Sequence, residues 1–193
     1  MNNSPSTTDS LVIGCVTEPV AKYLQQAARL LLSLRWFGGK VSNSPFILCT
    51  TGKLPEKTEC FFKKYGAQII LIDRFSQQHG PSNKLRFFEL DFLDKWDQIL
   101  LLDCDTVIVQ DPSEFLHTSG LSVKVADLPT VTTEQFQGLF SKFKLTMPPE
   151  KYIHDISGES CISYFNSGVI LLNSTWREKF AKTWSVYNKT VIE

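Results

Sequence analysis

An apolar run at residues 99–109, interrupted by two aspartates, constrains the fold of this 193-residue chain more than any other feature. Such a run is typical of a strand that is buried on both faces, as strands are in parallel sheets. Because side chains alternate along a strand, Asp103 and Asp105 would point to one side and Cys104 to the other. Two hard oxygen ligands at a strand end suit Mg²⁺ or Mn²⁺ that also carries a substrate's phosphates. This acidic pair therefore predicts a divalent-cation site at the edge of a parallel sheet.

The composition is that of an ordinary globular chain. Apolar residues make up 42% of the chain, charged residues make up 21%, and the formal net charge is zero. This balance argues against a broad surface for nucleic acid or anionic membranes. We expect residues 1–10 to be a disordered N-terminus and residues 11–193 to form a single domain. No segment has the roughly 18 apolar residues of a membrane span, and no apolar signal-like segment opens the chain.

The cysteines are odd in number and scattered, without metal-ligand spacing. Three of the five lie in apolar, strand-like runs, which is typical of reduced and buried thiols. We therefore expect a cytoplasmic location and no disulfide framework. The five are Cys15, Cys49, Cys60, Cys104 and Cys161.

Strand-like and helix-like segments alternate along the chain, which predicts a largely parallel sheet between two helical layers. Strands are expected at 11–16, 45–50, 67–73, 99–109, 121–127 and 163–172. Helices are expected from residue 20 to the Gly38-Gly39 stop, at 55–65, 82–96 and 176–186, with a short helical turn at 112–116. Residues 131–156 are the least regular stretch and are expected to be a loop with some helix. In such sheets, ligands bind outside the carboxyl ends of the strands, where Thr17 and the acidic pair fall.

Two known motifs compete for the acidic pair. In a calcium loop, Asp111 and Glu114 would complete the frame, but Val107 takes a ligand position and Ile108 replaces the required glycine. A haloacid-dehalogenase-type aspartyl phosphatase also has an apolar strand that ends in Asp-x-Asp-x-Thr. That motif usually opens its domain, whereas about half of this chain precedes it, and no later acidic motif follows to hold its Mg²⁺. The phosphatase stays as an alternative.

A third pattern covers most of the chain. Five segments occur in order: Val16-Thr17 with Tyr23, Asn83-Lys84-Leu85, Leu102-Asp103-Cys104-Asp105-Thr106-Val107, Asp111-Pro112, and Tyr164-Phe165-Asn166-Ser167-Gly168-Val169-Ile170-Leu171-Leu172-Asn173. This order resembles the GT-A fold glycosyltransferases of the glycogenin, galactinol synthase and lipopolysaccharide galactosyltransferase family. The resemblance implies a three-layer α/β/α domain with a mostly parallel central sheet, similar to Rossmann folds.

The resemblance also implies an activity and a set of site residues. A hexosyl group would pass from a UDP-sugar to an acceptor (a sugar, polyol, lipid-linked glycan or protein) with retention of anomeric configuration. The acidic pair would ligate Mn²⁺ or Mg²⁺, and no catalytic residue is assigned. The remaining donor-binding residues would be Thr17, Tyr23, Lys84, Cys104, Asn166, Ser167 and Gly168. Alternatively, Thr17 is only a helix N-cap and Tyr23 only a core aromatic.

Members of the resembled family continue beyond the point that corresponds to Glu193. Their next segments carry a further donor contact and a His-x-x-Gly metal ligand, which we expect to be missing here. A non-catalytic nucleotide-sugar-binding relative or fragment is therefore an alternative to an active enzyme. Irregular loops usually select acceptors, so residues 131–156 are the candidate acceptor loop.

Overall fold

The computed structural model describes residues 10–126, 131–149, 152–153, 158, 160–162 and 164–192. Apart from Ser10, the predicted disordered start lies outside the described residues. The chain divides into two compact units. Residues up to Ser122, together with those from Gly168 onward, form the first unit, and Val123–Ser167 form the second. Among the described helices, none combines the length and apolar character that a membrane crossing requires.

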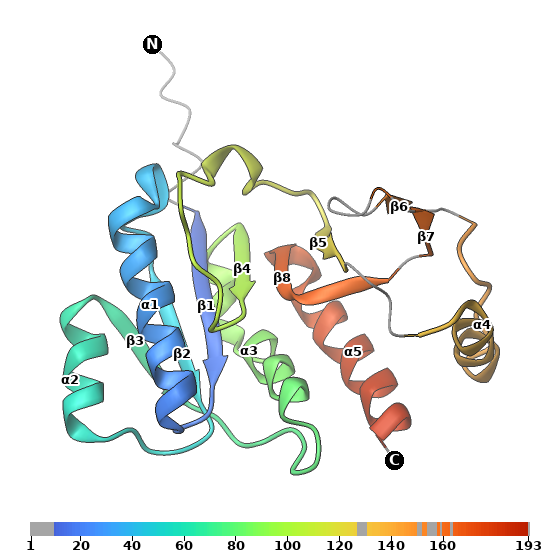
Figure 1. The fold of residues 1–193 in the computed structure, drawn as a ribbon, viewed down its shortest axis with the longest axis horizontal. Helices are drawn as coiled ribbons and strands as arrows, with labels where there is room; N and C mark the ends of the chain where they lie inside the picture. The colour runs from blue at the N-terminus through green and yellow to red at the C-terminus, as the bar shows by residue number, and fades with distance from the viewer. Residues whose placement is uncertain are drawn as a thin grey trace. The chain divides into compact units, whose positions relative to one another are not determined.

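The central sheet has six strands in the order β3-β2-β1-β4-β8-β5 (Figure 1). β1 pairs in parallel with β2 and β4, and β2 pairs in parallel with β3. β8 runs antiparallel to β4. The predicted α/β fold with a mostly parallel sheet is therefore confirmed. The strands are β1 (Leu11–Thr17), β2 (Phe46–Thr50), β3 (Ala67–Leu71), β4 (Gln98–Leu102), β5 (Leu121–Val125) and β8 (Phe165–Asn173).

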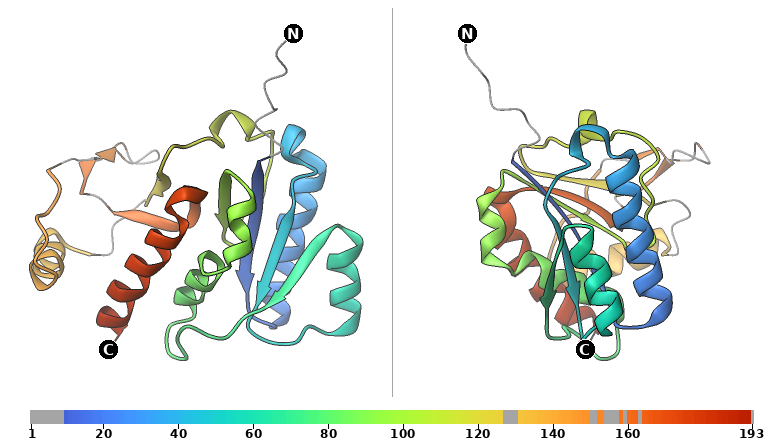
Figure 2. Two further views of the ribbon diagram at one scale, coloured as in Figure 1. Left: turned by 180° about the vertical axis from the view of Figure 1, so that it is seen from behind. Right: turned by 90° about the vertical axis from the view of Figure 1, so that its left-hand side faces the viewer.

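Helices of the first unit cover both faces of this sheet (Figure 2). α1 (Ala21–Phe37) and α2 (Glu56–Lys64) lie on one face, and α3 (Leu85–Phe88) and α5 (Arg177–Ile192) lie on the other. α1 buries an apolar stripe at helical spacing against alternate β1 residues, including Ile13 and Cys15. The intervening Gly14 faces Phe87 of α3. β1 is thus buried from both sides, as a central parallel strand should be.

The predicted helix at 82–96 is wrong. The segment forms a 3₁₀ turn at Gly80–Lys84, then α3, and then a second 3₁₀ turn at Asp91–Lys95. Between them, Leu90 has an extended backbone, with φ −78° and ψ 103°. This break leaves the carbonyl of Phe88 without a helical partner, and the Arg177 guanidinium of α5 donates to it at 2.9 Å. Tertiary packing has overridden the helical periodicity of the sequence.

The predicted strand at 99–109 is also too long. β4 ends at Leu102, and a turn follows in which the Thr106 N–H donates to the Asp103 carbonyl at 3.0 Å. The chain then crosses α1, where the Ile108 N–H donates to Ser33 Oγ at 3.0 Å. Val107 is exposed rather than buried in a sheet. The turn, and not strand alternation, therefore sets the directions of the acidic pair.

Asp111 holds this crossing segment against the residues that follow α1. Its carboxylate accepts the Lys40 N–H at 3.0 Å and the Ser113 N–H at 2.9 Å. These backbone hydrogen bonds lower the pKa of the Asp111 carboxyl. Gly39 has φ +53°, and a Cβ there would lie 2.4 Å from the Asp111 carboxylate, so glycine is required. The Asp111-Pro112 segment thus holds the chain that leads away from the acidic pair.

The second unit contains α4 (Thr133–Lys142) and an antiparallel pair, β6 (Tyr152–Ile153) with β7 (Ser160–Cys161). A capping box between Thr132 and Gln135 starts α4, and this is a sequence signature of a helix N-terminus. Part of the candidate acceptor loop, at residues 150–151 and 154–156, lies outside the described residues.

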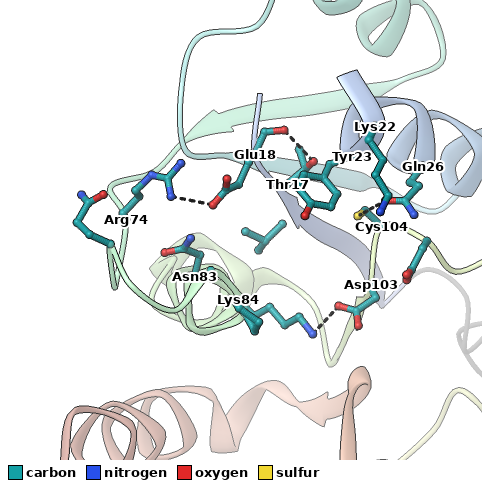
Figure 3. Close-up of a pocket in the computed structure, with 15 residues that line it drawn as sticks. Thr17, Glu18, Lys22, Tyr23, Gln26, Arg74, Asn83, Lys84, Asp103 and Cys104 are labelled. Carbon is teal, nitrogen blue, oxygen red and sulfur yellow. Dashed lines mark hydrogen bonds and ion pairs between the residues drawn. The ribbon is translucent and has the colours of Figure 1, made fainter. Parts of the chain in front are cut away.

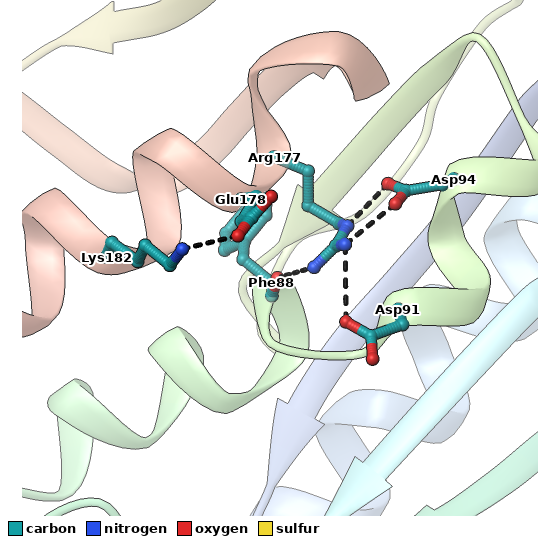
Figure 4. A network of polar contacts seen from close by, with 6 residues as sticks. All are labelled: Phe88, Asp91, Asp94, Arg177, Glu178 and Lys182. Atoms are coloured by element: carbon teal, nitrogen blue, oxygen red, sulfur yellow. Dashed lines mark hydrogen bonds and ion pairs between the residues drawn. The ribbon is translucent and has the colours of Figure 1, made fainter.

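A buried guanidinium joins α5 to the segment before β4 (Figure 4). The Arg177 side chain is 6% exposed, and its Nε and Nη2 donate to the two oxygens of Asp94 at 2.5 and 2.7 Å. Its Nη2 also reaches Asp91 at 3.3 Å. Bidentate pairing of this kind is the strongest protein ion-pair geometry. The hydrogen bond from Arg177 lowers the pKa of the Asp94 carboxyl.

Replacement of Asp94 by asparagine should lower the free energy of unfolding by about 1 kcal/mol at pH 7. The loss is small because the Asp94 side chain is 54% exposed and solvent screens the ion pair. Since the folded-state pKa is depressed, the extra stability of wild type is present above the unfolded pKa of about 3.9. It is lost as the pH falls through the folded pKa. Urea unfolding at several pH values from 7 to 3 should show the difference shrinking below about pH 4.

Asp91→Asn is the matched control, because Asp91 is 95% exposed and makes one long contact. Asp91→Asn should lower the free energy of unfolding much less than Asp94→Asn does. A difference between wild type and Asp94→Asn that stays constant with pH would contradict this assignment.

Candidate functional site

A cavity of about 590 Å³ opens at the carboxyl ends of β1 and β4 (Figure 3). Its lining comes entirely from the first unit. Strand ends of a parallel sheet are where α/β proteins bind ligands. The cavity brings together six of the nine predicted donor-site residues, which are Thr17, Tyr23, Lys84, Asp103, Cys104 and Asp105.

The acidic pair lines one side of this cavity, together with a lysine. Lys84 Nζ lies 2.5 Å from Asp103 Oδ1, and the two side chains are 15% and 32% exposed. Asp105 is exposed at the same rim. Carboxylates with this access can reach a cation and a ligand from solvent. Lys84 adds a positive charge that can attract an anionic group.

The predicted Asn166-Ser167-Gly168 segment is divided between the two units. The Gly168 carbonyl accepts the Asp103 N–H at 2.8 Å, so this glycine is hydrogen-bonded directly to the acidic segment. Asn166 and Ser167 belong to the second unit. Their contact with a donor sugar remains a prediction.

The first strand and helix contribute Thr17 and Tyr23. Thr17 is buried, and its hydroxyl donates to the Glu18 carbonyl at 3.2 Å. The N-cap of α1 is Val20, so Thr17 is not the helix cap. Tyr23 is 39% exposed and lines the cavity, so it is not a core aromatic. Both residues are therefore placed where a ligand could meet them.

The thiol between the two aspartates is shielded. Burial, followed by the charges of Asp105 and Asp103, raises the pKa of Cys104 to about 11. Cys104 is thus protonated at neutral pH, and it lines the cavity without being a nucleophile. Burial also raises the pKa of Cys49 to about 12 and that of Cys15 well above its usual range.

Sequence reasoning missed six polar residues of the cavity, and three of them, Glu18, Arg74 and Asn83, lie together. Glu18 follows Thr17 and pairs with Arg74 Nη1 at 2.8 Å. Arg74 comes three residues after β3, so the rule that ligands bind at strand ends could have identified it. Asn83 precedes Lys84 in one of the quoted segments and is almost fully buried. It lies between the Glu18–Arg74 pair and the Lys84–Asp103 pair.

A metal site of three protein side chains is not present in the part of the chain that the structure describes. No group of three His, Cys, Asp or Glu side chains there could hold a metal ion. The acidic pair can thus supply two side-chain ligands. Hard cations such as Mg²⁺ readily complete their coordination with phosphate oxygens and water.

Several solved structures with a similar fold are glycosyltransferases. The galactosyltransferase LgtC, solved with donor and acceptor sugar analogs, is 17% identical with a TM-score of 0.61, over 94% of this chain and 66% of that one. The glycosyltransferase GlyE of Streptococcus pneumoniae TIGR4 is 14% identical with a TM-score of 0.56, over 95% of this chain and 39% of that one. Core-mannan synthase A of Aspergillus fumigatus, in its Mn/GDP form, is 11% identical with a TM-score of 0.51, over 96% and 68%. The fold is therefore that of the GT-A glycosyltransferases.

The sequence itself places the chain in a family. Residues 14–193 match the Rhodobacterales glycosyltransferase domain, and the chain belongs to this family. The match supports the glycosyltransferase resemblance over the phosphatase alternative. No curated protein gives a significant match. The chain spans 66% of the length of LgtC.

Proposed function

We propose that this chain binds a UDP-sugar with Mn²⁺ or Mg²⁺ and transfers its hexosyl group to an acceptor with retention of configuration. The observation that carries the proposal is the cavity at the sheet edge, where Asp103 and Asp105 meet Lys84. The choice of uracil and the retention both come from the family resemblance. Buried free thiols at Cys15 and Cys49 support a reducing, cytoplasmic location.

The residues present fit a divalent cation shared with a diphosphate. Asp103 and Asp105 offer hard carboxylate oxygens on one cavity wall. Bound there, the cation would neutralise the charge that develops on the departing nucleoside diphosphate. The Mn/GDP form of core-mannan synthase A supports the same pairing of metal and diphosphate.

The protein's own part in transfer is to bind and orient the donor. Lys84 would place its positive charge beside the diphosphate. Its Nζ lies next to Asp103, which is one of the two residues proposed to hold the cation. Thr17 and Tyr23 line the cavity from the end of β1 and the first turn of α1, where the nucleoside would bind. These contacts position the anomeric carbon for the acceptor.

A non-catalytic nucleotide-sugar-binding role is the second candidate. The observation that favours it is the metal site, because the part of the chain that the structure describes holds no group of three side chains that could ligate a metal ion. Fold and donor site alone do not guarantee turnover. Both candidates bind the donor at the same site, but only the enzyme transfers its sugar.

Release of UDP from a panel of UDP-sugars, with and without Mn²⁺, separates the two candidates. An enzyme should release UDP in a metal-dependent way, and Asp105→Ala should remove this activity. Tight UDP binding without any release, in the presence of a broad acceptor panel, would favour the binding protein. Failure to bind any nucleotide would contradict both.

Lys84→Met should have opposite effects on the two ligands. UDP with Mn²⁺ should bind about tenfold more weakly or worse, because a charged hydrogen bond is lost. Mn²⁺ alone should bind several-fold more tightly, because Asp103 no longer shares its oxygen with a lysine. Calorimetry measures the first affinity, and electron paramagnetic resonance of free Mn²⁺ measures the second.

Lys22→Met is the control for a general loss of cavity charge, since Lys22 lines the same cavity and stacks near Tyr23. It should weaken UDP binding less and leave Mn²⁺ binding nearly unchanged. A Lys84 variant that weakens both ligands equally would contradict the ion-pair argument.

A further inference from the structure

Asn83 carries a buried amide donor that the protein does not use. The residue is 2% exposed and lies in the 3₁₀ turn at Gly80–Lys84. Its Oδ1 accepts the Phe75 N–H at 2.8 Å. A backbone N–H can only donate, so this hydrogen bond fixes which end of the amide is oxygen. The Nδ2 group has no hydrogen-bond partner among the described residues.

Asn83 belongs to the wall of the donor cavity, where its buried Nδ2 lies behind the cavity surface. Figure 3 shows the Asn83 amide between two ion pairs, with Glu18–Arg74 on one side and Lys84–Asp103 on the other. Buried donors are nearly always paired in native proteins, and an orphan calls for a ligand or an ordered water. Its place in the cavity wall makes a ligand the direct explanation.

The charges around Asn83 restrict which part of a ligand it meets. The acidic pair and Lys84 provide the cation and the positive charge that suit a diphosphate. On the other side, Glu18 and Arg74 neutralise each other as an ion pair, so that side adds no net positive charge for a second anion. A neutral amide donor between them suits a neutral acceptor oxygen. On a nucleoside diphosphate, those oxygens are the ribose hydroxyls and the base carbonyls.

We propose that Asn83 Nδ2 donates a hydrogen bond to a neutral acceptor oxygen of the donor's nucleoside and so helps to select the nucleotide. The inference rests on the proposed function, because it takes the diphosphate to lie at the acidic pair. The hydrogen bond from the Phe75 N–H holds the Asn83 side chain in place, so that its Nδ2 can donate to the nucleoside. Discrimination follows because a ligand without the acceptor would leave the amide unpaired.

Asn83→Asp tests the donor atom with little change in shape. The aspartate keeps an oxygen for the Phe75 N–H and replaces the Nδ2 donor with an acceptor. Uridine is the first probe, because it is uncharged and needs no metal. In a ligand-observed NMR titration, uridine should bind wild type at least about tenfold more tightly than Asn83→Asp.

Gln77→Glu is the matched control, because it introduces the same charge from an exposed residue of the same cavity. It should lower UDP affinity through repulsion of the diphosphate and leave uridine affinity within about twofold. Equal uridine affinities for Asn83→Asp and Gln77→Glu would overturn the proposal. Wild type that binds neither uridine nor UDP would instead overturn the proposed function.

2′-Deoxyuridine tests one of these oxygens, the ribose 2′-hydroxyl. If the acceptor is the ribose 2′-hydroxyl, the deoxy probe should bind wild type as weakly as uridine binds Asn83→Asp. If it is another nucleoside oxygen, wild type should bind both probes equally, and Asn83→Asp should lose both. The side-chain amide resonance of Asn83 in the unaltered protein gives a check independent of variant folding. It should shift on addition of uridine, and its failure to shift would overturn the proposal.

Discussion

Asp103→Asn and Asp105→Asn are each expected to lower metal-dependent UDP binding by about tenfold or more and to abolish sugar transfer. Each substitution removes one of the two carboxylates proposed to hold the cation. Asparagine keeps the size of the side chain but loses its charge, so the effect reports on the metal rather than on packing. Calorimetry with UDP and Mn²⁺ measures the loss.

Asp73→Asn provides the control for the acidic pair. Asp73 is exposed near the same edge of the sheet but does not line the cavity. It should bind UDP and Mn²⁺ as wild type does. Thermal unfolding should show that all three variants remain folded. An Asp105 variant with wild-type affinity for UDP and Mn²⁺ would remove the basis of the metal assignment.

Gly14→Ala is expected to destabilise the first unit by about 3 kcal/mol or more. A Cβ at Gly14 would lie 2.3 Å from the ring of Phe87 and 2.8 Å from the Ile47 carbonyl oxygen. Phe87 is fully buried and the carbonyl belongs to β2, so neither can move aside cheaply. Denaturant unfolding, followed by tryptophan fluorescence, measures the loss.

Gly138→Ala is the contrasting glycine substitution. Gly138 lies in α4, and nothing approaches within 4 Å of the position of its Cβ. Alanine should leave stability unchanged or raise it by up to about 1 kcal/mol, because helices favour alanine over glycine. A Gly14→Ala protein as stable as Gly138→Ala would show that β1 and α3 do not pack as described.

Much of the fold could be predicted because the hydrophobic pattern has a physical period. β1, β2 and β3 are apolar runs between turn residues, and α1 repeats its apolar residues at helical spacing. The 82–96 segment could not be predicted, because the Phe88 carbonyl next to its break at Leu90 is paired with Arg177, almost ninety residues further along the chain. The same holds for the end of β4, where the chain turns to reach Ser33 of α1.

The residues of the candidate site differ in the same way, because some have a local signal in the sequence and others do not. The acidic pair stood out because charges interrupt an apolar run. Glu18, Arg74 and Asn83 do not interrupt an apolar run, and apart from the position of Arg74 after a strand, what joins them is a cavity built from separate segments of the chain. The orphan amide of Asn83 depends on a hydrogen bond from Phe75, which only the folded backbone shows.

The most direct test of the central claim is calorimetry of UDP binding to the wild-type chain, once with Mn²⁺ and once with a chelator. A site built on Asp103, Asp105 and Lys84 should bind UDP at least about tenfold more tightly with Mn²⁺, because the cation links both carboxylates to the diphosphate. Equal affinity under the two conditions would contradict a metal-assisted donor site at the acidic pair.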